Sequence, residues 1–399
     1  MNRKTEAQPV ARVPLKIKQS IGYFLAFIAL GLSFTALGPT LTELAAQTSS
    51  GLGEFSFVFF ASSLGYLLGS FSSGRLYDRY PGHHIMAVVL LLTAGALFLV
   101  PFIRTLWLLT VILLLSGMFS GALDVGGNTL IVWAHGDHGD VYMNAMHAFF
   151  GVGAFLSPVV VAQAASLGGG IRGAFWTLAF LMLPVAFYVL SVKSPSIKVS
   201  ERQPVNTIST GSRKRFRGNL VVIIAVFFFL YVGAETSYGG WIATYARALD
   251  LGNQVTAAYL TSAFWGALTV GRFLSVVLAL KGKPEAMLAI DLLGCIAGLI
   301  LAFWGAGSVT LTWAGTIITG LFMASIFPAA INLAEHRMTI TGKITAWFFV
   351  GGSLGGMTLP MLIGQLFEKI GPRVTLLAIL VNMILACGIF LYMLRASNQ

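Results

Sequence analysis

The residues from Ser116 to Trp133, which read SGMFSGALDVGGNTLIVW, place an ionisable side chain inside an apolar run. At about 100° per residue in a helix, four small or polar residues fall within about 60° of one another: Gly117, Gly121, Asp124 and Asn128. A carboxylate at membrane depth is costly and is normally tolerated where it faces a protein interior or a water-filled path. The stretch predicts a helix whose polar face borders a cavity. The alternative is a structural carboxylate satisfied by hydrogen bonds between helices.

Composition places the whole chain in a membrane. Of its 399 residues, 57% are hydrophobic and 10% are charged, whereas an average soluble domain has about 25% charged residues. The mean hydropathy is +0.84. A net charge of +11 would suggest nucleic acid in a soluble chain, but here the basic residues lie in predicted loops, where they orient the protein against anionic lipid. We expect lipid as a partner and no nucleic acid.

Apolar segments of membrane-spanning length recur along the chain. They predict an all-α integral membrane protein with twelve transmembrane helices. The expected spans are 20–45, 55–77, 84–103, 106–133, 141–166, 171–192, 219–246, 254–280, 285–304, 309–334, 343–367 and 374–394.

An internal repeat divides these spans into two sets of six. SLGYLLGSFSSGR, which ends at Arg75, is similar to SAFWGALTVGR, which ends at Arg272, and FFGVGAFLSP, which ends at Pro158, is similar to FVGGSLGGMTLP, which ends at Pro360. The repeat predicts two pseudo-symmetric six-helix bundles, residues 1–192 and 218–399. The basic segment 193–217 between them, rich in Ser, Pro and Thr, is predicted to be a flexible linker.

The distribution of Lys and Arg predicts the orientation. With the N-terminus inside, 20 of the 25 basic residues fall on the inner side, including Arg272, which we assign to the loop around 281–283. This split follows the positive-inside rule. We therefore expect both termini to be cytoplasmic in a multi-pass protein of the cell membrane, which is the inner membrane if the source is a bacterium.

The loop between the second and third spans carries a recognisable motif. It reads GRLYDRYPGHH, and it resembles the G-x-x-x-D-R-x-G-[RK] loop of the major facilitator superfamily through Gly74, Asp78, Arg79 and Gly82. Pro81 is an apparent insertion, and two histidines stand where basic residues are usual. The resemblance implies a gating loop whose charges change partners as the two halves rock; an ordinary charged loop is the alternative.

Three further stretches narrow the resemblance. LDVGGNTLIVW, NAMHAFFGVGAFLSP and YVGAETSYGGWIATYA together resemble the fucose-permease-like branch, especially its sodium-dependent glucose transporter 1 group. The resemblance implies a secondary active symporter of a hexose or a related polar solute. It carries over onto Asp124, Asn128, Asn144, His147 and Glu235.

The residue types support a solute and ion site independently. Asn144 and His147 share a helical face and could meet Asp124 and Asn128 across a cavity, so Asp124 and His147 are the candidates for ion coupling. Segment 219–246 presents a stripe about 120° wide that could stack on and bond a sugar; its members are Tyr231, Glu235, Tyr238, Trp241 and Tyr245. Alternatively, His147 is structural, and Trp241 and Tyr245 are interfacial anchors.

Other functions find little support in the sequence. HGDHGD, residues 135–140, lacks the spacing of a metal site, and Cys295 and Cys387 lie in apolar segments as expected for free thiols. No nucleotide loop or hydrolytic signature occurs, so we expect no enzyme and no cofactor, only H⁺ or Na⁺ as a coupling ion. We expect a monomer. A proton-coupled exporter of amphipathic compounds is the main alternative, and a channel or a receptor without turnover is another.

Overall fold

The computed structural model describes residues 14–195, 218–279, 283–338 and 342–396, and within these ranges it contains helices and no strand. Most of the predicted linker, residues 196–217, lies outside them. The first half comprises α1 (Leu15–Phe34), α2 (Leu37–Gln47), α3 (Leu52–Phe55), α4 (Phe57–Arg79), α5 (Gly82–Leu99), α6 (Leu106–His135), α7 (Gly139–Ser166) and α8 (Gly170–Ser191). The second half comprises α9 (Gly218–Ala248), α10 (Gln254–Ala279), α11 (Pro284–Trp304), α12 (Val309–Met323), α13 (Ile326–Arg337), α14 (Gly342–Ile370) and α15 (Val374–Ala396).

The helices confirm the predicted membrane fold. In the part of the chain that the structure describes, 11 spans are long and apolar enough to cross a membrane. The remaining predicted span, 254–280, corresponds to α10, which has 26 residues and packs between α7 and α12. Its polar side chains explain its lower hydropathy, because Thr261, Ser262 and Thr269 are buried against neighbouring helices and need not face lipid.

Two predicted spans are each broken into two helices. The sequence predicts continuous helices over 20–45 and 309–334, but the helix is interrupted at Thr35–Ala36 and again at Ala324–Ser325. Pro39 and Pro328 are each the third residue after a break. Proline has no N–H to donate and clashes with the preceding turn, so it fits the first turn of a new helix better than the middle of a long one. The first span also begins earlier than predicted, at Leu15.

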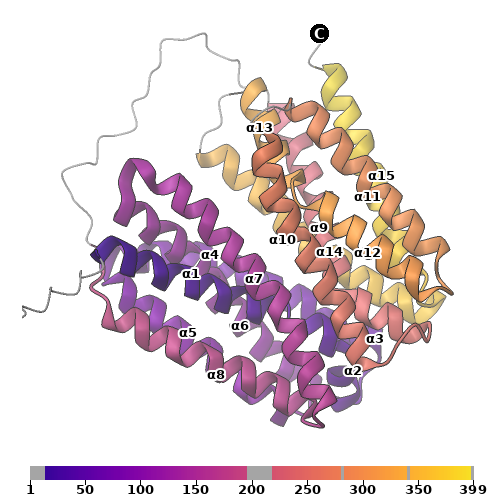
Figure 1. Cartoon of the computed structure of the whole chain (residues 1–399), viewed down its shortest axis with the longest axis horizontal. Coiled ribbons are helices and arrows are strands. Elements are labelled where there is room, and N and C mark those ends of the chain that lie inside the picture. Colours follow the sequence, from indigo (N-terminus) through magenta and orange to yellow (C-terminus); the bar gives the residue numbers. More distant parts are fainter. Residues whose placement is uncertain (1–13, 196–217, 280–282, 339–341, 397–399) are drawn as a thin grey trace, which may run out of the picture.

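The same helix pairings recur in both halves. In the first half α4 packs on α6, α1 on α7, and α5 on α8; in the second half α10 packs on α12, α9 on α14, and α11 on α15. The sequence repeat relates α4 to α10 and α7 to α14, so each pairing has its counterpart. Figure 1 shows the two sets of helices side by side. The pairings therefore have the pseudo-symmetry that the repeat predicts.

Glycines bring α4 and α6 into close contact. A Cβ atom added at Gly69 would lie 1.9 Å from the carbonyl oxygen of Met118, and one added at Gly117 would lie 2.0 Å from that of Ser62. Helices in membranes use such small residues to let backbones approach. The glycines on the predicted polar face of α6 therefore pack against α4, and Asp124 lies one turn beyond this contact.

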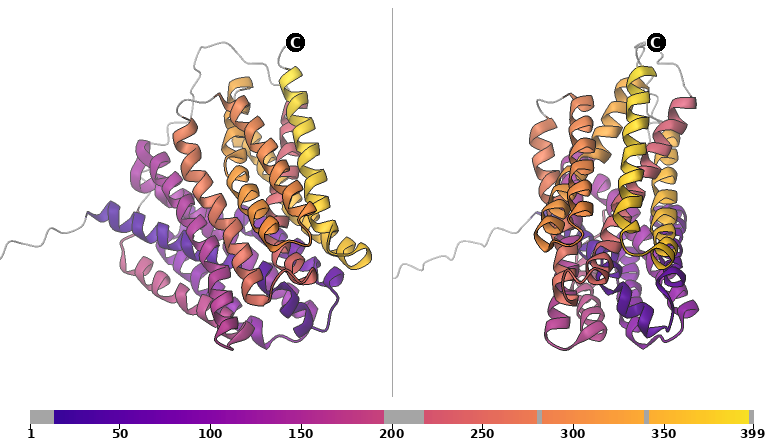
Figure 2. Two further views of the ribbon diagram at one scale, coloured as in Figure 1. Left: turned by 45° about the vertical axis from the view of Figure 1, so that its right-hand side comes forward. Right: turned by 90° about the vertical axis from the view of Figure 1, so that its right-hand side faces the viewer.

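The two halves touch near one end of the molecule. We call the end where α1 begins and α15 finishes the termini end. At the opposite end, the backbone N–H of Gly53 donates to Glu368 on α14 at 3.0 Å, and Ser56 donates to the carbonyl of Met361 at 3.0 Å. In Figures 1 and 2 the helices of the two halves lie close at this opposite end and diverge toward the termini end.

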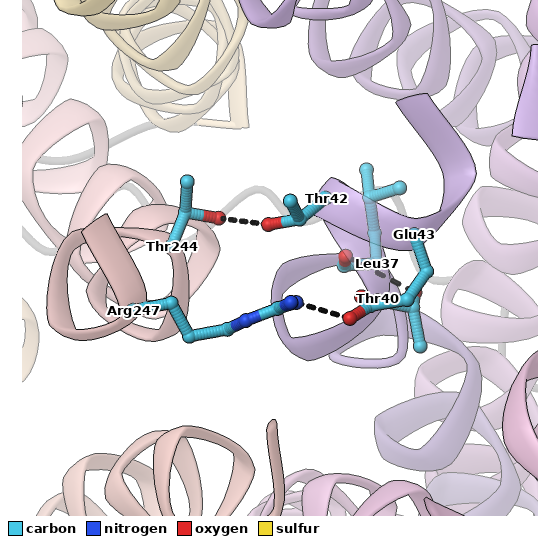
Figure 3. A network of polar contacts seen from close by, with 6 residues as sticks. All are labelled: Leu37, Thr40, Thr42, Glu43, Thr244 and Arg247. Carbon is cyan, nitrogen blue, oxygen red and sulfur yellow. Dashed lines mark hydrogen bonds and ion pairs between the residues drawn. The ribbon is translucent and has the colours of Figure 1, made fainter. Parts of the chain in front are cut away.

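A latch of four residues strengthens the contact at the opposite end (Figure 3). We use the term latch for Thr42 and Glu43 on α2 together with Thr244 and Arg247 on α9. Glu43 and Arg247 form an ion pair, and the two threonine hydroxyls lie 3.5 Å apart. The latch joins the first helix pair of one half to the first helix of the other.

Candidate functional site

Asp124 lies at the centre of a hydrogen-bonded group on α4 and α6. The Tyr66 hydroxyl donates to Oδ2 of Asp124 at 2.6 Å, and Nδ2 of Asn128 donates to Oδ1 at 3.1 Å. All three side chains are half-buried, so they retain access to solvent within the helical assembly. The structure thus places Asp124 and Asn128 together, as predicted. Tyr66 was missed because an isolated tyrosine in an apolar segment gives no periodic signal.

His147 joins this group from α7. Its Nε2 lies 3.2 Å from Oδ1 of Asn128, and the ring meets Phe27 edge-on with centroids 5.2 Å apart. Since Nδ2 of Asn128 donates to Asp124, its Oδ1 faces His147 and can only accept. Nε2 of His147 therefore carries a proton, and a continuous chain of donors runs from His147 through Asn128 to Asp124.

Glu235 and Arg272 form an ion pair in the second half. Nη2 of Arg272 lies 3.5 Å from Oε1 of Glu235, and the two side chains are 29% and 14% exposed, in that order, so the pair is partly solvated. Arg272 is also an electrostatic neighbour of His147. The pair therefore continues the polar group of the first half across the boundary between the halves.

The position of Arg272 corrects the sequence interpretation. We assigned it to the inner loop because its segment matches the repeat that ends at Arg75, but α10 continues for seven residues beyond it, to Ala279. Arg272 therefore lies within a helix that packs inside the assembly. Its place two turns before the end of an expected span was the signal that could have identified it as an intramembrane cation.

The aromatic stripe of α9 is packed into the protein. Tyr231, Tyr238, Trp241 and Tyr245 are each 0% exposed. The Tyr231 hydroxyl donates to the carbonyl of Met323 at 3.2 Å, and the Trp241 indole N–H donates to that of Pro360 at 3.0 Å. The Tyr238 hydroxyl lies 2.8 Å from that of Thr316. In this conformation the rings contact neighbouring helices, and Glu235 is the member of the stripe with access to solvent.

Asn144 stands apart from the other candidates. It lies on α7 three residues before His147, and its side chain is exposed. The hydrogen bonds that join Asp124, Asn128 and His147 do not include it. The structure therefore groups four of the five residues that the resemblance carried over, counting Glu235 through its ion pair.

The predicted gating loop connects α4 to α5. Gly74, Asp78 and Arg79 lie in the last two turns of α4, with both charged residues exposed, and Gly82 begins α5. The neighbouring His83 is only 2% exposed. Its Nδ1 lies 2.7 Å from the carbonyl of Val192 and its Nε2 2.9 Å from the Tyr23 hydroxyl, so it fastens α5 to α1 and to the end of α8.

The segment 135–140 contains residue types that can bind metals. His135 stacks on Tyr142 with ring centroids 3.5 Å apart, and its Nε2 lies 2.7 Å from the Ser20 hydroxyl. Within the residues open to description, no three metal-ligating side chains gather. His135 therefore has structural partners.

Known proteins resemble the chain over most of its length. It is 31% identical to sodium-dependent glucose transporter 1 of Homo sapiens over 86% of this chain and 72% of that protein, and 25% identical to major facilitator superfamily domain-containing protein 4A of Mus musculus over 89% and 87%. Among solved structures, a bacterial homologue of the human lysosomal transporter Spinster, captured inward-facing and occupied, has a TM-score of 0.78 at 12% identity, covering 96% of this chain and 98% of that one. A mutant of the nucleoside transporter NupG has a TM-score of 0.76 at 14% identity, covering 95% and 100%.

A sequence pattern that describes the Major Facilitator Superfamily also matches this chain. It covers residues 23–360, from within α1 to within α14, and these include the gating loop and every residue of the polar group. The arrangement of helices, the paired halves and this match agree with one another. The chain is a membrane transporter that belongs to the Major Facilitator Superfamily.

Proposed function

We propose that the protein is an ion-coupled symporter of a hexose or a related polar solute, working by alternating access. The observation that carries this proposal is the polar group in which Asp124 and His147 of the first half approach Arg272 and Glu235 of the second. Solute and ion sites of such transporters lie between two repeats, near mid-membrane. Hydroxyl-rich solutes need paired donors and acceptors, and these side chains supply both.

The ion and the solute are assigned to different parts of this group. Asp124 binds the coupling ion, H⁺ or Na⁺, and His147 assists it through Asn128. Glu235, Asn128 and Asn144 bond solute hydroxyls. The buried tyrosines and Trp241 support α9 behind Glu235 and become available for stacking only if the packing changes when the halves rock. Sodium dependence in the name of the Homo sapiens relative supports Na⁺, but H⁺ fits the same residues.

The orientation completes the proposal. With Arg272 placed inside α10, 19 of the 25 basic residues are still expected on the side of the termini, so the termini face the cytoplasm and the latch faces outward. The halves are then joined on the outer side and diverge on the inner side, which is an inward-facing arrangement.

Turnover can be tested by counterflow. Proteoliposomes loaded with unlabelled D-glucose should transiently accumulate external labelled D-glucose without any imposed ion gradient. A receptor would bind the sugar without counterflow, and a channel would equilibrate it without an overshoot. Absence of binding and of counterflow for D-glucose, D-fucose and other hexoses would reject the sugar assignment.

Cysteine labelling tests the orientation. In a background lacking Cys295 and Cys387, cysteines placed at Ser50 and at Gly307 should react with an impermeant maleimide added to intact cells, because both lie in connections between helices at the opposite end. A cysteine at Ser209 in the linker should react only after the cells are opened. Labelling of position 209 in intact cells would reverse the orientation.

The latch provides a prediction about the conformational equilibrium. A partly exposed ion pair contributes about 0.5–1 kcal/mol, so Glu43→Gln should raise the outward-open population by roughly two- to fivefold. Spin labels at Ser50 and Gly307 should then show a larger fraction of long distances. Glu54→Gln, which changes an exposed carboxylate at the same end, is the matched control. An identical distance distribution in Glu43→Gln and the parent would contradict a role for the latch.

A further inference from the structure

The close approach of α7 and α10 sets His147 beside Arg272. A Cβ atom at Gly151 would lie 2.4 Å from the Thr269 hydroxyl, so the two backbones pack tightly there. His147 lies one turn from Gly151 and Arg272 one turn from Thr269. Because the helices are antiparallel, both steps lead toward the termini end and bring the two side chains to the same level. The electrostatic interaction between them agrees with this placement.

The resulting chain has more negative than positive groups. It runs through Tyr66, Asp124, Asn128 and His147 in the first half and through Arg272 and Glu235 in the second. It contains two carboxylates and one arginine, and the count takes His147 as the neutral imidazole. One positive charge is missing.

A third carboxylate near this chain has its own partner. Asp291 on α11 is 7% exposed and accepts a hydrogen bond of 2.6 Å from the Ser325 hydroxyl, directly before α13. The positive end of a helix dipole stabilises an anion at this position. The Cys295 thiol is an electrostatic neighbour of both Asp291 and Glu235. Asp291 therefore shares no hydrogen bond with the chain in the part of the protein that the structure describes, and the charge count covers the chain alone.

We propose that Arg272 is the resident counter-ion of the transport cycle: it compensates one of the two carboxylates, Asp124 and Glu235, and a single monovalent coupling cation compensates the other. The proposal rests on the ion-coupled transport proposed above. In the inward-facing arrangement Arg272 contacts Glu235 through one distance of 3.5 Å, and among the described residues no Lys or Arg side chain forms an ion pair with Asp124. The coupling ion binds there.

The missing charge explains why transport would require an ion. Closing the inner side removes water from the polar group, and an uncompensated carboxylate is then expensive to keep. With the cation on Asp124 the group is neutral and can be enclosed. Without the cation, Arg272 would have to leave Glu235 and pair with Asp124 before the group could be enclosed. Glu235 would then be the uncompensated carboxylate.

Variants that each remove one charged side chain test this charge count. The property measured is the ion dependence of sugar exchange in proteoliposomes. The readout is the ratio of D-glucose exchange with and without whichever ion, Na⁺ or H⁺, stimulates the unmodified protein. Glu235→Gln leaves one carboxylate and one arginine, so the ratio should fall to about 1 at saturating sugar. Asp124→Asn removes the other carboxylate and should have the same effect. Arg272→Gln leaves two carboxylates without a counter-ion and should reduce ion-free exchange below that of the unmodified protein.

The decisive variant is the double substitution Glu235→Gln with Arg272→Gln. It again leaves one uncompensated carboxylate, so the ion dependence lost in Glu235→Gln should return. If Glu235 and Arg272 served only to hold α9 against α10, or only to bind sugar, the double variant would be no more ion-dependent than the single one. That result would overturn the proposal.

Two controls separate this inference from the proposed function. Asp291→Asn changes an intramembrane carboxylate outside the chain and should keep the ion dependence of the unmodified protein; a loss there would also overturn the count. If the unmodified protein exchanges sugar without any ion dependence, the proposed symport fails first. If sugar exchange by the unmodified protein is ion-dependent and exchange by Glu235→Gln is equally ion-dependent, the proposed symport stands and the proposed role of Arg272 as counter-ion is rejected. Monodispersity of each purified variant is checked before exchange is measured.

Discussion

Asp124→Asn is expected to abolish gradient-driven accumulation of the solute while exchange across the membrane persists. The substitution keeps the shape of the side chain and removes its charge. The new amide oxygen can still accept from Nδ2 of Asn128, which also donates to the main-chain carbonyl of residue 124, and the new Nδ2 can donate to the Tyr66 hydroxyl oxygen. Oδ1 of Asn128 then stays toward Nε2 of His147. The hydrogen-bonded group can therefore survive, and the ion site alone is lost.

The size of the effect follows from coupling. A carrier that no longer binds the ion cannot draw on its gradient, so the ratio of internal to external sugar should fall to about 1. Uptake of labelled D-glucose into proteoliposomes under an imposed gradient measures this ratio. Asp291→Asn is the matched control and should accumulate sugar normally. Full accumulation by Asp124→Asn would make the carboxylate structural.

Gly69→Val is expected to remove most of the folded protein. Its Cβ would lie 1.9 Å from the Met118 carbonyl oxygen and 2.7 Å from the carbonyl carbon, so backbone atoms of α6 would have to move. Overpacking against flexible side chains costs about 1–3 kcal/mol, and a backbone contact relaxes less easily. Separating α4 from α6 would also part Tyr66 from Asp124.

Size-exclusion chromatography of the detergent-solubilised protein measures this effect. The monodisperse peak of Gly69→Val should fall to a small fraction of that of the unmodified protein. Gly95→Val on α5 is the control, because a Cβ at Gly95 meets nothing within 4 Å. Equal yields from the two variants would show that the glycine contact between α4 and α6 does not hold the first half together.

The sequence predicted the features that depend on local pattern. Span positions follow from apolar length, and the repeat ending at Arg75 and Arg272 predicts the paired packing because equivalent small residues meet equivalent neighbours. The grouping of Asp124 with Asn128 follows from helical periodicity. His147 could be proposed because an ionisable residue inside a span needs a polar neighbour.

Features that depend on tertiary packing could not be predicted in the same way. The stripe from Tyr231 to Tyr245 is about 120° wide, so it covers both the face toward the other half and the faces toward α12 and α14. Periodicity cannot say which of its residues are covered. The chain breaks before Pro39 and Pro328 were hidden because both prolines stand in apolar surroundings that continue the hydropathy of the span. To predict the ion pair between Arg272 and Glu235, one would have to know the angle at which α9 and α10 pack.

The central claim is that an ion gradient drives sugar across the membrane through this protein. Labelled D-glucose uptake should be measured in proteoliposomes of the unmodified protein under an inward gradient of Na⁺, then of H⁺, each against an equal concentration of ion on both sides. The account predicts accumulation above the external concentration with one of these inward gradients, and collapse of that accumulation when the gradient is dissipated. Uptake that only equilibrates under both gradients, or accumulation that requires an outward gradient, would contradict symport.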